Sequence, residues 1–434
     1  MPFPKIAIIG AGPGGLTLAR LLQQNNIPCT IYESEKDRHT RDQGGTLDLH
    51  PKAGQRALRE AGLFEEFTKY ARPEGDAHKL VRHDGHVLWN DNKLGANAQT
   101  PPPGEADDNK PEIDRNRLRQ ILLDSLQPDV VQWDRKVSRI EADPRAKTSK
   151  YTIYFADGSK EADIELVVGA DGAWSKVRPL LTDATPFYSG VTGIELWATD
   201  VTEKHPWLCE YVGQGSCFMF DDGRAIMAQR NGNDSLRVYA CVRQPETWAD
   251  DCGIDWSDRD GAREAVIRDY FADCSDDLKR LVRESRDELI VRKMYMLPVG
   301  ITWPSCPGVT LLGDAAHLMT PFAGVGVNVA MADALVLARS LIKKKDGLLA
   351  KAFSNSHNIA AAVKEYEAWM FGFAKENAEK TFKGLRLHFS PEGGPEMAQR
   401  LRGRYGEAAG MKLSEEVFGT STKGAPDSPP AEAA

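Results

Sequence analysis

The sequence predicts an α/β fold: a dinucleotide-binding unit with a parallel sheet, an inserted antiparallel sheet and a long C-terminal helix. Residues 5–9 and 29–33 are short apolar strands that enclose a glycine-rich turn and a helical segment, the pattern of a parallel β-α-β unit. From about residue 187 to 297 apolar and polar residues alternate, which is typical of an antiparallel sheet. Helical periodicity then returns and extends to about residue 387.

The elements follow one another in a clear order. Helices are expected at residues 16–24, 52–62 and 117–126, and a hairpin at 78–89 turns at Asp84-Gly85. Residues 98–111 contain three consecutive prolines and are expected to form a surface loop. Further strands are expected at 137–142, 151–155 and 165–169. The middle region has strands at 190–201, 217–220, 225–229, 236–242 and 289–297 with one helix at 263–271.

The remaining chain is mostly helical. After a strand at residues 309–313, helices are expected at 328–341 and 359–387, and a disordered tail from 419.

Composition excludes several classes of protein. The chain has 434 residues, more than one hydrophobic core usually serves. Its 55 basic and 63 acidic residues give a net charge of −8, which disfavours a nucleic-acid surface because phosphate binding needs a basic patch. The 7 cysteines have no CxxC spacing, so no zinc site or disulfide framework is expected. With no targeting segment or membrane span in view, we expect a cytoplasmic monomer without metal, membrane or nucleic-acid partners.

The glycine-rich turn has the pattern G-x-G-x-x-G between a strand and a helix, typical of Rossmann-type units. Gly10 permits the tight turn, Gly12 lets the backbone approach a pyrophosphate, and Gly15 lets the helix pack closely on the strand. Glu33 ends the second strand, where a carboxylate accepts from ribose hydroxyls. These residues favour either NAD or the adenosine half of FAD.

Two later segments also follow apolar strands. Asp171-Gly172 comes after the strand at 165–169, and Gly313-Asp314 comes after the strand at 309–313. Residues 324–328 (GVGVN) then open a helix whose free N–H groups favour an anion or an electron-rich carbonyl.

Taken together and in this order, GAGPGG, the DG segment and GDAAHLMTPFAGVGVN resemble the group A flavoprotein monooxygenases, the para-hydroxybenzoate hydroxylase-like aromatic hydroxylases. Within that family the chain is most similar to the tetracycline-inactivating monooxygenases, or tetracycline destructases, through GGTLDLH, PEIDRNRLRQILLDSL, WDRK and SKVR. The resemblance implies a Rossmann-type FAD-binding domain in three parts, at 1–75, 106–180 and 299–345. It places the substrate domain at 76–105 and 181–298, and a C-terminal helix bridging both domains at 346–418, before the tail at 419–434.

The resemblance also implies which residues bind the cofactors FAD and NADPH. Arg41 borders the flavin and takes part in the use of NADPH, although a solvated arginine is the alternative in this charged stretch. Asp48 contacts FAD or forms a turn. The other implied contacts with FAD are Gly10, Gly12, Gly15, Glu33, Arg115, Asp314, Pro321, Gly324, Gly326, Val327 and Asn328.

Substrate-positioning residues are expected mainly in the middle sheet. Similarity to the destructases places Glu195, Arg224 and Arg237 near the polar edge of the substrate, and His388 lines the pocket from the C-terminal helix. The alternative is that both arginines are solvated edge-strand residues. Glu195 and Arg237 stand where the family has an amide and an imidazole, which leaves the substrate open.

Two tryptophans, Trp174 and Trp197, are expected in the core, with stacking on a ligand as the alternative, and His317 is expected to be structural.

The function that the resemblance implies is an FAD-dependent monooxygenase that uses NAD(P)H and dioxygen. It hydroxylates a polycyclic phenol, enol or polyketide through a flavin C4a-hydroperoxide, and the resemblance extends to the inactivation of tetracyclines. This route needs no protein nucleophile, so no catalytic side chain is assigned. The alternatives are a flavin-dependent reductase or dehydrogenase of the same fold, and a non-catalytic flavin-containing drug-binding protein.

Overall fold

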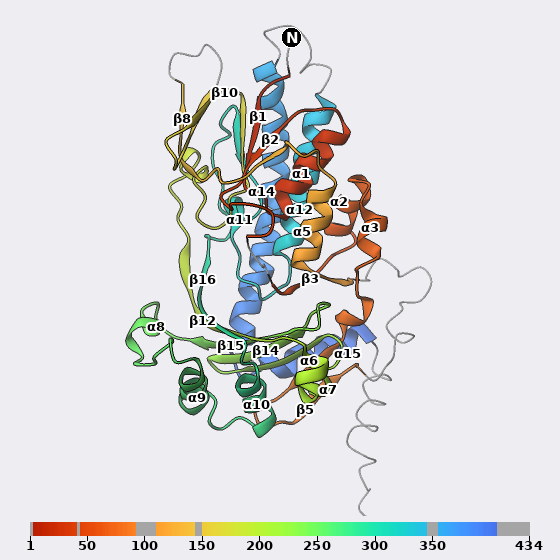
Figure 1. The fold of residues 1–434 in the computed structure, drawn as a ribbon, viewed down its shortest axis with the longest axis vertical. Helices are drawn as coiled ribbons and strands as arrows, with labels where there is room; N and C mark the ends of the chain where they lie inside the picture. The colour runs from red at the N-terminus through yellow and green to blue at the C-terminus, as the bar shows by residue number, and fades with distance from the viewer. Residues whose placement is uncertain (1–2, 41–43, 93–109, 144–149, 345–354, 406–434) are drawn as a thin grey trace, which may run out of the picture.

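The computed structural model describes residues 3–40, 44–92, 110–143, 150–344 and 355–405. Arg41, most of the proline-rich loop and the tail from 419 lie outside these residues. Figure 1 shows an upper domain around a parallel sheet and a lower domain around a second sheet. The two are connected by the long strands β12 (Phe187–Ala198) and β16 (Glu288–Met296) and by the helix α14 (Asn355–His388).

The upper domain is built on a five-stranded parallel sheet in the order β17-β11-β1-β2-β7. Its strands are β1 (Ile6–Ile9), β2 (Thr30–Tyr32), β7 (Val131–Gln132), β11 (Leu166–Gly169) and β17 (Val309–Leu311). β1 and β11 are buried at every position, which explains their continuous apolar sequence. The predicted β-α-β unit is confirmed.

Helices cover one side of this sheet, and a small sheet covers the other (Figure 1). α1 (Pro13–Gln24) packs against α5 (Arg115–Asp124) and α12 (Gly326–Lys343), and α12 packs against α2 (Gly54–Glu60). The small sheet is antiparallel, and Phe155 from it packs on Tyr32 with ring centroids 5.1 Å apart. Its strands are β8 (Val137–Ala142), β9 (Tyr151–Phe155) and β10 (Lys160–Ile164).

The lower domain is a seven-stranded sheet in the order β16-β12-β15-β14-β13-β4-β5. Its remaining strands are β4 (His78–Val81), β5 (Val87–Asn90), β13 (Ser216–Asp221), β14 (Arg224–Arg230) and β15 (Leu236–Arg243). Every neighbouring pair is antiparallel except β13 and β4, which run parallel. The predicted antiparallel sheet is therefore confirmed with one parallel exception, which arises because the hairpin β4–β5 joins from a distant part of the chain.

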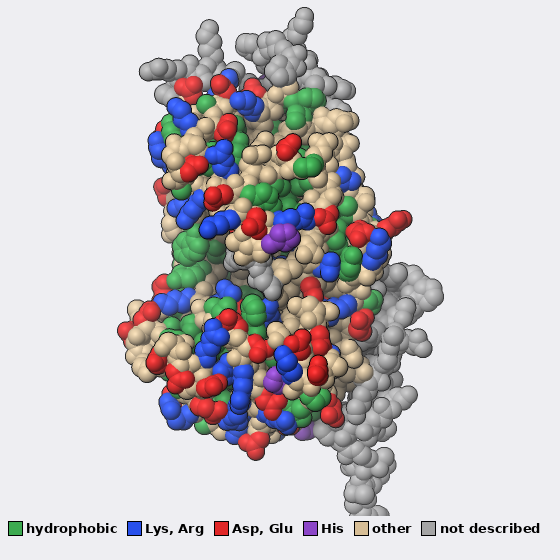
Figure 2. Space-filling model, in the orientation of Figure 1, with side chains coloured by type: hydrophobic (Ala, Val, Ile, Leu, Met, Phe, Trp, Pro, Cys, Tyr) green, Lys and Arg blue, Asp and Glu red, His purple; other side chains and the backbone are tan. Residues whose placement is uncertain are grey.

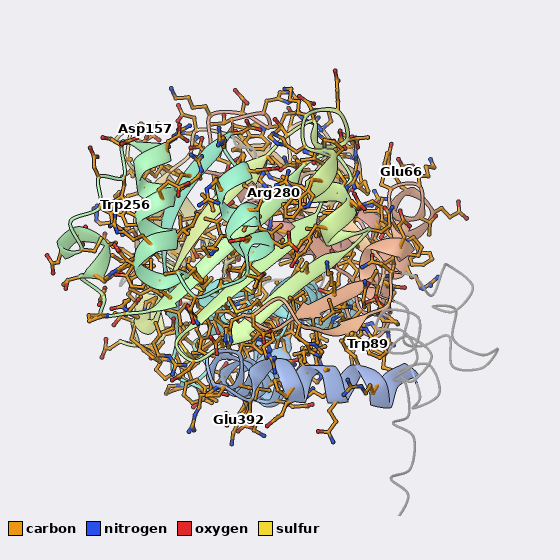
Figure 3. All side chains as sticks on the ribbon, turned by 90° about the horizontal axis from the view of Figure 1, so that it is seen from below. Glu66, Trp89, Asp157, Trp256, Arg280 and Glu392 are labelled. Atoms are coloured by element: carbon orange, nitrogen blue, oxygen red, sulfur yellow. The ribbon has the colours of Figure 1, made fainter. Side chains whose placement is uncertain are left out.

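Helices α9 (Arg259–Tyr270) and α10 (Asp276–Glu284) cover the lower face of this sheet (Figure 1). Figure 3, seen from below, shows both helices lying across the strands, with Arg280 on α10. The sequence indicated only α9. α10 was missed because it is short, although Ser275 caps it by accepting from the Leu278 amide. Three single-turn or two-turn helices complete the domain: α6 (Val201–Lys204), α7 (Pro206–Val212) and α8 (Trp248–Asp251).

The two faces of the lower sheet have different environments because side chains alternate along a strand. Ile194 and Leu196 on β12 point down into the core between the sheet and the helices α9 and α10. Val191 belongs to a second buried cluster on the upper face, which also contains Phe322 from the upper domain. The upper face therefore meets the upper domain.

Two further elements connect the domains. α14 packs on α12 and β17 and descends to the lower sheet, where α15 (Gly393–Tyr405) follows it beside β13 and β5 (Figure 1). α15 was not expected as a separate helix. β3 (Thr46–Asp48) and β6 (Glu112–Asp114) form a two-stranded antiparallel ribbon. The Gly232 amide of the lower domain donates to Asp114 on this ribbon.

Short helices account for the rest of the regular structure: α3 (Phe64–Thr68), η1 (Pro73–Asp76), η3 (Arg178–Leu180) and α11 (Asp314–His317). Within the described ranges no helix has the length and apolar character needed to cross a bilayer. Acidic and basic side chains are interspersed over the face in Figure 2, and the surface is hollowed where the two domains meet.

Candidate functional site

The glycine-rich turn between β1 and α1 leaves open space at one position only. Gly10 has φ +107°, and a Cβ there would lie 2.3 Å from the Ala170 carbonyl oxygen. A Cβ at Gly15 would lie 2.2 Å from the Gly10 oxygen, so both glycines are needed for packing. At Gly12 no atom of the described chain lies within 4 Å of the Cβ position. The space beside Gly12 is therefore where a ligand can approach the backbone.

Glu33 lies directly beside this turn. One carboxylate oxygen accepts from the Ala11 amide at 2.6 Å, and the other accepts from the Glu35 amide at 3.0 Å. Buried Arg119 on α5 donates to the Ala11 carbonyl and, at 2.6 Å, to the Glu35 carboxylate. Arg119 thus fixes the turn to the end of β2, a role that no sequence pattern pointed to.

Asp314 begins α11 and has solvent-accessible surface although it lies deep in the protein. A carboxylate that is surrounded by protein and still exposed lines a recess, which we call the cavity. Burial raises the pKa of Asp314, and the nearby His317 and Arg115 moderate the rise.

The turn that carries Asp314 is held by His317 and Asp333. The Asp333 carboxylate accepts from the Gly313 amide at 2.9 Å and pairs with His317 Nε2 at 2.6 Å. Burial disfavours the imidazolium, but the charge of Asp333 outweighs it and raises the pKa of His317 overall. The structural role expected for His317 agrees with this geometry.

The start of α12 borders the same region. Pro321, Gly324 and Gly326 are exposed, and no described atom lies within 4 Å of a Cβ position at Gly326. Val327 is half-buried. Asn328 is buried, and its side chain accepts from the His50 amide at 2.7 Å and donates to the Asp48 carbonyl at 2.8 Å. The Asn328 amide group is therefore occupied by the protein, which leaves the backbone N–H groups of the first turn for a ligand.

Arg115 and Tyr239 extend the cavity to the lower sheet. Arg115 begins α5, and its positive charge acts on both Asp314 and Tyr239. Burial, together with the charge of Glu195, raises the pKa of Tyr239 to about 12. Tyr239 nevertheless keeps accessible surface, as Asp314 does. Neither Arg115 nor the Tyr239 hydroxyl has a hydrogen-bonded side-chain partner in the part of the chain that the structure describes, so both are available to a ligand.

Beside Tyr239, four side chains on the upper face of the sheet form a charged group. Glu195 accepts from the Trp197 indole at 2.8 Å, lies 3.5 Å from the Arg237 guanidinium and contacts the guanidinium of Arg292. The Arg237 guanidinium also stacks 3.0 Å from the centroid of the Trp197 ring. The backbone covers this group closely, since a Cβ at Gly44 would overlap Arg237. We call Glu195, Trp197, Arg237 and Arg292 the carboxylate–arginine group.

The prediction for Arg224 is wrong. Its side chain points to the lower face, where it pairs with Asp221 at 2.7 Å and Asp273 at 2.6 Å and donates to the Tyr270 carbonyl. Side chains alternate between the two faces of the sheet along each strand, and the register of β14 and β15 gives Arg224 and Arg237 opposite positions in this alternation. The two arginines therefore lie on opposite faces of the sheet. Arg224 is a structural link between the sheet and α9.

His388 lies on the upper face, at the end of α14. Its ring stacks on Phe220 with centroids 4.1 Å apart and meets the edge of Phe322. Burial lowers the pKa of His388 to about 4, so the ring is neutral at neutral pH. Its ring contacts are with the aromatic side chains of Phe220 and Phe322, and its place in a substrate pocket stays a prediction.

The two tryptophans differ from expectation. Trp174 is 60% exposed, so its assignment to the core is wrong. Trp197 belongs to the carboxylate–arginine group instead of the core. No sequence pattern pointed to Tyr239 or Arg292, because an isolated Tyr or Arg in an alternating strand has no distinctive spacing.

Comparison with known proteins identifies the family. The model of a family described as FAD binding domain matches residues 4–365. The chain is 32% identical to the monooxygenase penA of Penicillium thymicola, over 92% of this chain and 98% of the relative. It is 33% identical to the monooxygenase asqM of Emericella nidulans, over 89% of this chain and 96% of the relative.

The chain belongs to the FAD-dependent monooxygenases. Solved structures share its fold. HpxO of Klebsiella pneumoniae, complexed with FAD and uric acid, superposes with a TM-score of 0.69 at 23% identity, covering 97% of this chain and 98% of HpxO. The tetracycline destructase Tet(55) gives a TM-score of 0.66 at 17% identity, covering 99% and 100%. The resemblance to this flavoprotein family is thus confirmed, while the destructases themselves share the fold at low identity.

The residues of this monooxygenase fit FAD. Gly12 and Gly326 each border space that a Cβ would enter, at the N-termini of α1 and α12. Glu33 lies beside the first space, and the accessible Asp314 lies deep in the cavity. The donor set consists of helix N-terminal amides with carboxylates for hydroxyl groups, which suits a dinucleotide.

Proposed function

We propose that this monooxygenase uses NADPH and dioxygen to hydroxylate a polycyclic phenol, enol or polyketide with an acidic hydroxyl group. The observation that carries the proposal is the set of charged and polar side chains that come together where the domains meet: Arg115 acts on both Asp314 and Tyr239, and Tyr239 lies beside the carboxylate–arginine group. Bound FAD supplies electron transfer from NADPH and activation of dioxygen. The protein residues hold the cofactor and the substrate.

Cofactor binding is assigned to the upper domain. Glu33 accepts from the ribose hydroxyls, and the amides around Gly12 bind the pyrophosphate. Asp314 would bind hydroxyl groups of the ribityl chain, and the first turn of α12 at Gly326 and Val327 would bind the flavin. The positive end of an 18-residue helix stabilises negative charge near its first turn.

Substrate binding is assigned to the lower sheet. Arg237 and Arg292 carry two positive charges and Glu195 one negative charge, so the group has a net charge of +1. Such a group favours a substrate with an ionised oxygen, because guanidinium groups bind oxygen anions with two parallel hydrogen bonds. Trp197 holds the Arg237 plane by stacking, and the Tyr239 hydroxyl adds a donor that remains neutral below about pH 12. His388 and Phe322 form an apolar wall that favours a flat ring system.

The reductant is assigned to NADPH, and Arg41 is proposed to assist its reaction with the flavin. Arg41 lies outside the described residues and just before Gly44, which covers the carboxylate–arginine group. Support for this part of the proposal is therefore the sequence resemblance alone.

The test begins with the purified protein, which should be yellow with bound FAD. NADPH oxidation is then followed with and without salicylate, urate and tetracycline, and the products are weighed by mass spectrometry under isotopically labelled dioxygen. A product heavier by one labelled oxygen atom supports hydroxylation. Rapid NADPH oxidation that reduces an added acceptor without incorporating labelled oxygen would instead indicate a reductase or dehydrogenase.

Tetracycline is included because its enolised diketone is an electron-rich, acidic oxygen group of the required kind. Glu195 and Arg237 differ from the residues of the destructases, so we propose slow, NADPH- and oxygen-dependent loss of tetracycline absorbance. An unaltered tetracycline mass after prolonged turnover removes this substrate and leaves the hydroxylase proposal in place.

A further inference from the structure

A small polar pocket at the domain boundary is not used by the function proposed above. It is bordered by the first turn of α5, by Gly44 and Gly45 before β3, and by the loop that joins β14 to β15. Its volume is about 160 Å³, whereas clefts for drug-sized ligands measure roughly 300–1,000 Å³, so it suits a single substituted ring. We call it the loop pocket. The polar side chains that line it are Asp114, Asn116, Arg117, Gln120, Asn231 and Asn233.

The loop between β14 and β15 is fixed by its own hydrogen bonds. The Asn231 backbone amide donates to the Ser235 carbonyl at 2.9 Å, and the Asn231 side chain donates to the Ser235 hydroxyl at 3.0 Å. That hydroxyl donates to the side-chain oxygen of Asn233 at 2.6 Å. The Gly232 amide donates to Asp114 at 2.9 Å and ties the loop to β6. The two asparagine side chains therefore hold defined positions in the wall of the pocket.

These hydrogen bonds leave one donor and one acceptor on the two asparagines. Asn233 uses its side-chain oxygen, so its NH₂ group remains, and Asn231 uses its NH₂ group, so its oxygen remains. If both amide groups are turned and the Ser235 hydroxyl donates to Asn231, the NH₂ group of Asn231 and the oxygen of Asn233 remain instead. One donor and one acceptor are left in either case.

The acceptor on Asn231 has an unmet hydrogen-bonding requirement. Asn231 is 5% exposed, and its Oδ1 has no hydrogen-bond partner among the residues that the structure describes. A buried carbonyl oxygen without a partner is costly, and buried polar groups in native proteins are generally hydrogen-bonded. An N–H group of a ligand in the pocket would meet this requirement.

The charges around the loop pocket disfavour an ion as its ligand. Asp114 pairs with Arg72 at 3.1 Å, which compensates its charge. Arg117 is exposed, and its guanidinium lies over the Tyr70 ring at 4.4 Å from the centroid. A metal cation would meet these two arginines, and an anion would meet the electron-rich oxygen of Asn231. A neutral ligand with a donor and an acceptor of its own suits the pocket better.

We propose that the loop pocket recognises a planar amide on a single ring, either a primary carboxamide or a lactam. The ligand N–H donates to the side-chain oxygen of one asparagine, and the ligand C=O accepts from the NH₂ group of the other. The nicotinamide ring of the reductant carries a primary carboxamide, and a lactam in a substrate carries the same pair of groups.

The position of the loop pocket connects it with the proposed substrate site. Gly44 and Gly45 border both, since a Cβ at Gly44 would overlap Arg237 and a Cβ at Gly45 would lie 3.6 Å from the Tyr239 hydroxyl. A ring held in the pocket therefore lies beside the carboxylate–arginine group. This link to turnover rests on the proposed function, whereas amide binding itself does not.

The first experiment measures amide binding without turnover. The purified protein is titrated with nicotinamide and with nicotinate, and binding is followed by saturation-transfer NMR. Nicotinamide should bind at least roughly tenfold more tightly, because a carboxylate has no donor for the buried asparagine oxygen. A smaller preference, tighter binding of nicotinate, or no binding of nicotinamide overturns the amide site.

Variants then locate the site. Asn233→Ala should weaken nicotinamide binding by roughly threefold to tenfold, because one hydrogen bond is lost. Asn231→Ala should weaken it at least as much, and circular dichroism checks the folding of this buried variant. The control Gln132→Ala removes an amide group on β7 that donates to the Asp129 carbonyl at 3.0 Å, and it should bind nicotinamide as wild type does. Unchanged binding in folded Asn233→Ala overturns the assignment to this pocket.

The second experiment shows which amide the pocket takes during turnover. KM for NADPH and KM for the substrate found by mass spectrometry are compared in wild type and Asn233→Ala. A raised KM for NADPH alone supports the nicotinamide ring, and a raised KM for the substrate alone supports a lactam. Unchanged values for both overturn a role in turnover. A protein that lacks bound FAD or does not oxidise NADPH refutes the proposed function instead, and the nicotinamide titration still decides the amide site.

Discussion

Replacing Glu195 by Gln removes one charge from the carboxylate–arginine group and changes almost nothing else. The Gln oxygen still accepts from the Trp197 indole, but Arg237, whose side chain is 2% exposed, loses its ion pair with Glu195. Breaking a buried ion pair from one side costs about 3–5 kcal/mol, because the remaining guanidinium stays in a poorly solvated place. We take about 3 kcal/mol, the lower end of the range, because Arg237 keeps its stacking on Trp197 and half-exposed Arg292 is hydrated.

A matched control is available on the opposite face of the same sheet. Asp221→Asn also converts a carboxylate that pairs with an arginine, but the Arg224 pair is partly exposed and Arg224 retains Asp273. This change should cost less than about 1 kcal/mol.

Thermal unfolding followed by tryptophan fluorescence distinguishes the two variants. At about 2–4 °C per kcal/mol for a domain of this size, Glu195→Gln should lower the midpoint by roughly 6–12 °C and Asp221→Asn by only a few degrees. If Glu195→Gln is as stable as wild type within about 0.5 kcal/mol, the buried charge pairing inferred for Arg237 is incorrect.

Three other predictions concern the upper domain. Gly12→Val should abolish FAD binding, while the apoprotein should unfold at the wild-type temperature because the Cβ position at Gly12 is open. Gly15→Ala should destabilise even the apoprotein, because its Cβ would overlap the Gly10 oxygen. Thermal unfolding of both apoproteins is measured by circular dichroism. Asp333→Asn should destabilise the protein more at pH 6 than at pH 9 in urea titrations. The pKa of His317 is higher in the folded protein than in the unfolded chain, and the stability from this difference is complete at pH values below the unfolded pKa. This stability is lost as the pH rises through the folded pKa. Equal losses of stability at pH 6 and pH 9 in Asp333→Asn would therefore contradict the ion pair. Arg41→Ala should slow anaerobic flavin reduction by NADPH more than it weakens FAD binding; equal reduction rates in stopped flow would remove Arg41 from this role.

The upper domain was predictable because its signals are local. A strand, three spaced glycines, a helix and an acid at the end of the next strand occupy fewer than thirty consecutive residues, and each has a steric or electrostatic reason to be there. Gly10 and Gly15 are required by contacts of 2.3 and 2.2 Å, which no larger residue permits. The same locality explains why the helix starting at Gly326 was placed correctly.

The sequence was enough to predict the strands of the lower sheet, but not which of their side chains face the cavity. The sequence of β14, RAIMAQR, is apolar on both faces, since one face meets α9 and α10 and the other meets the upper domain. Alternation therefore could not decide whether Arg224 or Arg237 points to the cavity. Both arginines have carboxylate partners, and only the pairing of strands shows that the partners lie on opposite faces.

The sequence by itself determined the fold class, the flavin-type turn and the order of the domains, because these depend on periodicity and on steric limits between near neighbours. The tertiary structure decided which side chains meet at the domain boundary: Arg115 between Asp314 and Tyr239, and Glu195 between two arginines. These contacts join residues tens to hundreds of positions apart. Their pKa values and ion pairs arise from burial and from the charges of distant neighbours, which exist only once the chain has folded.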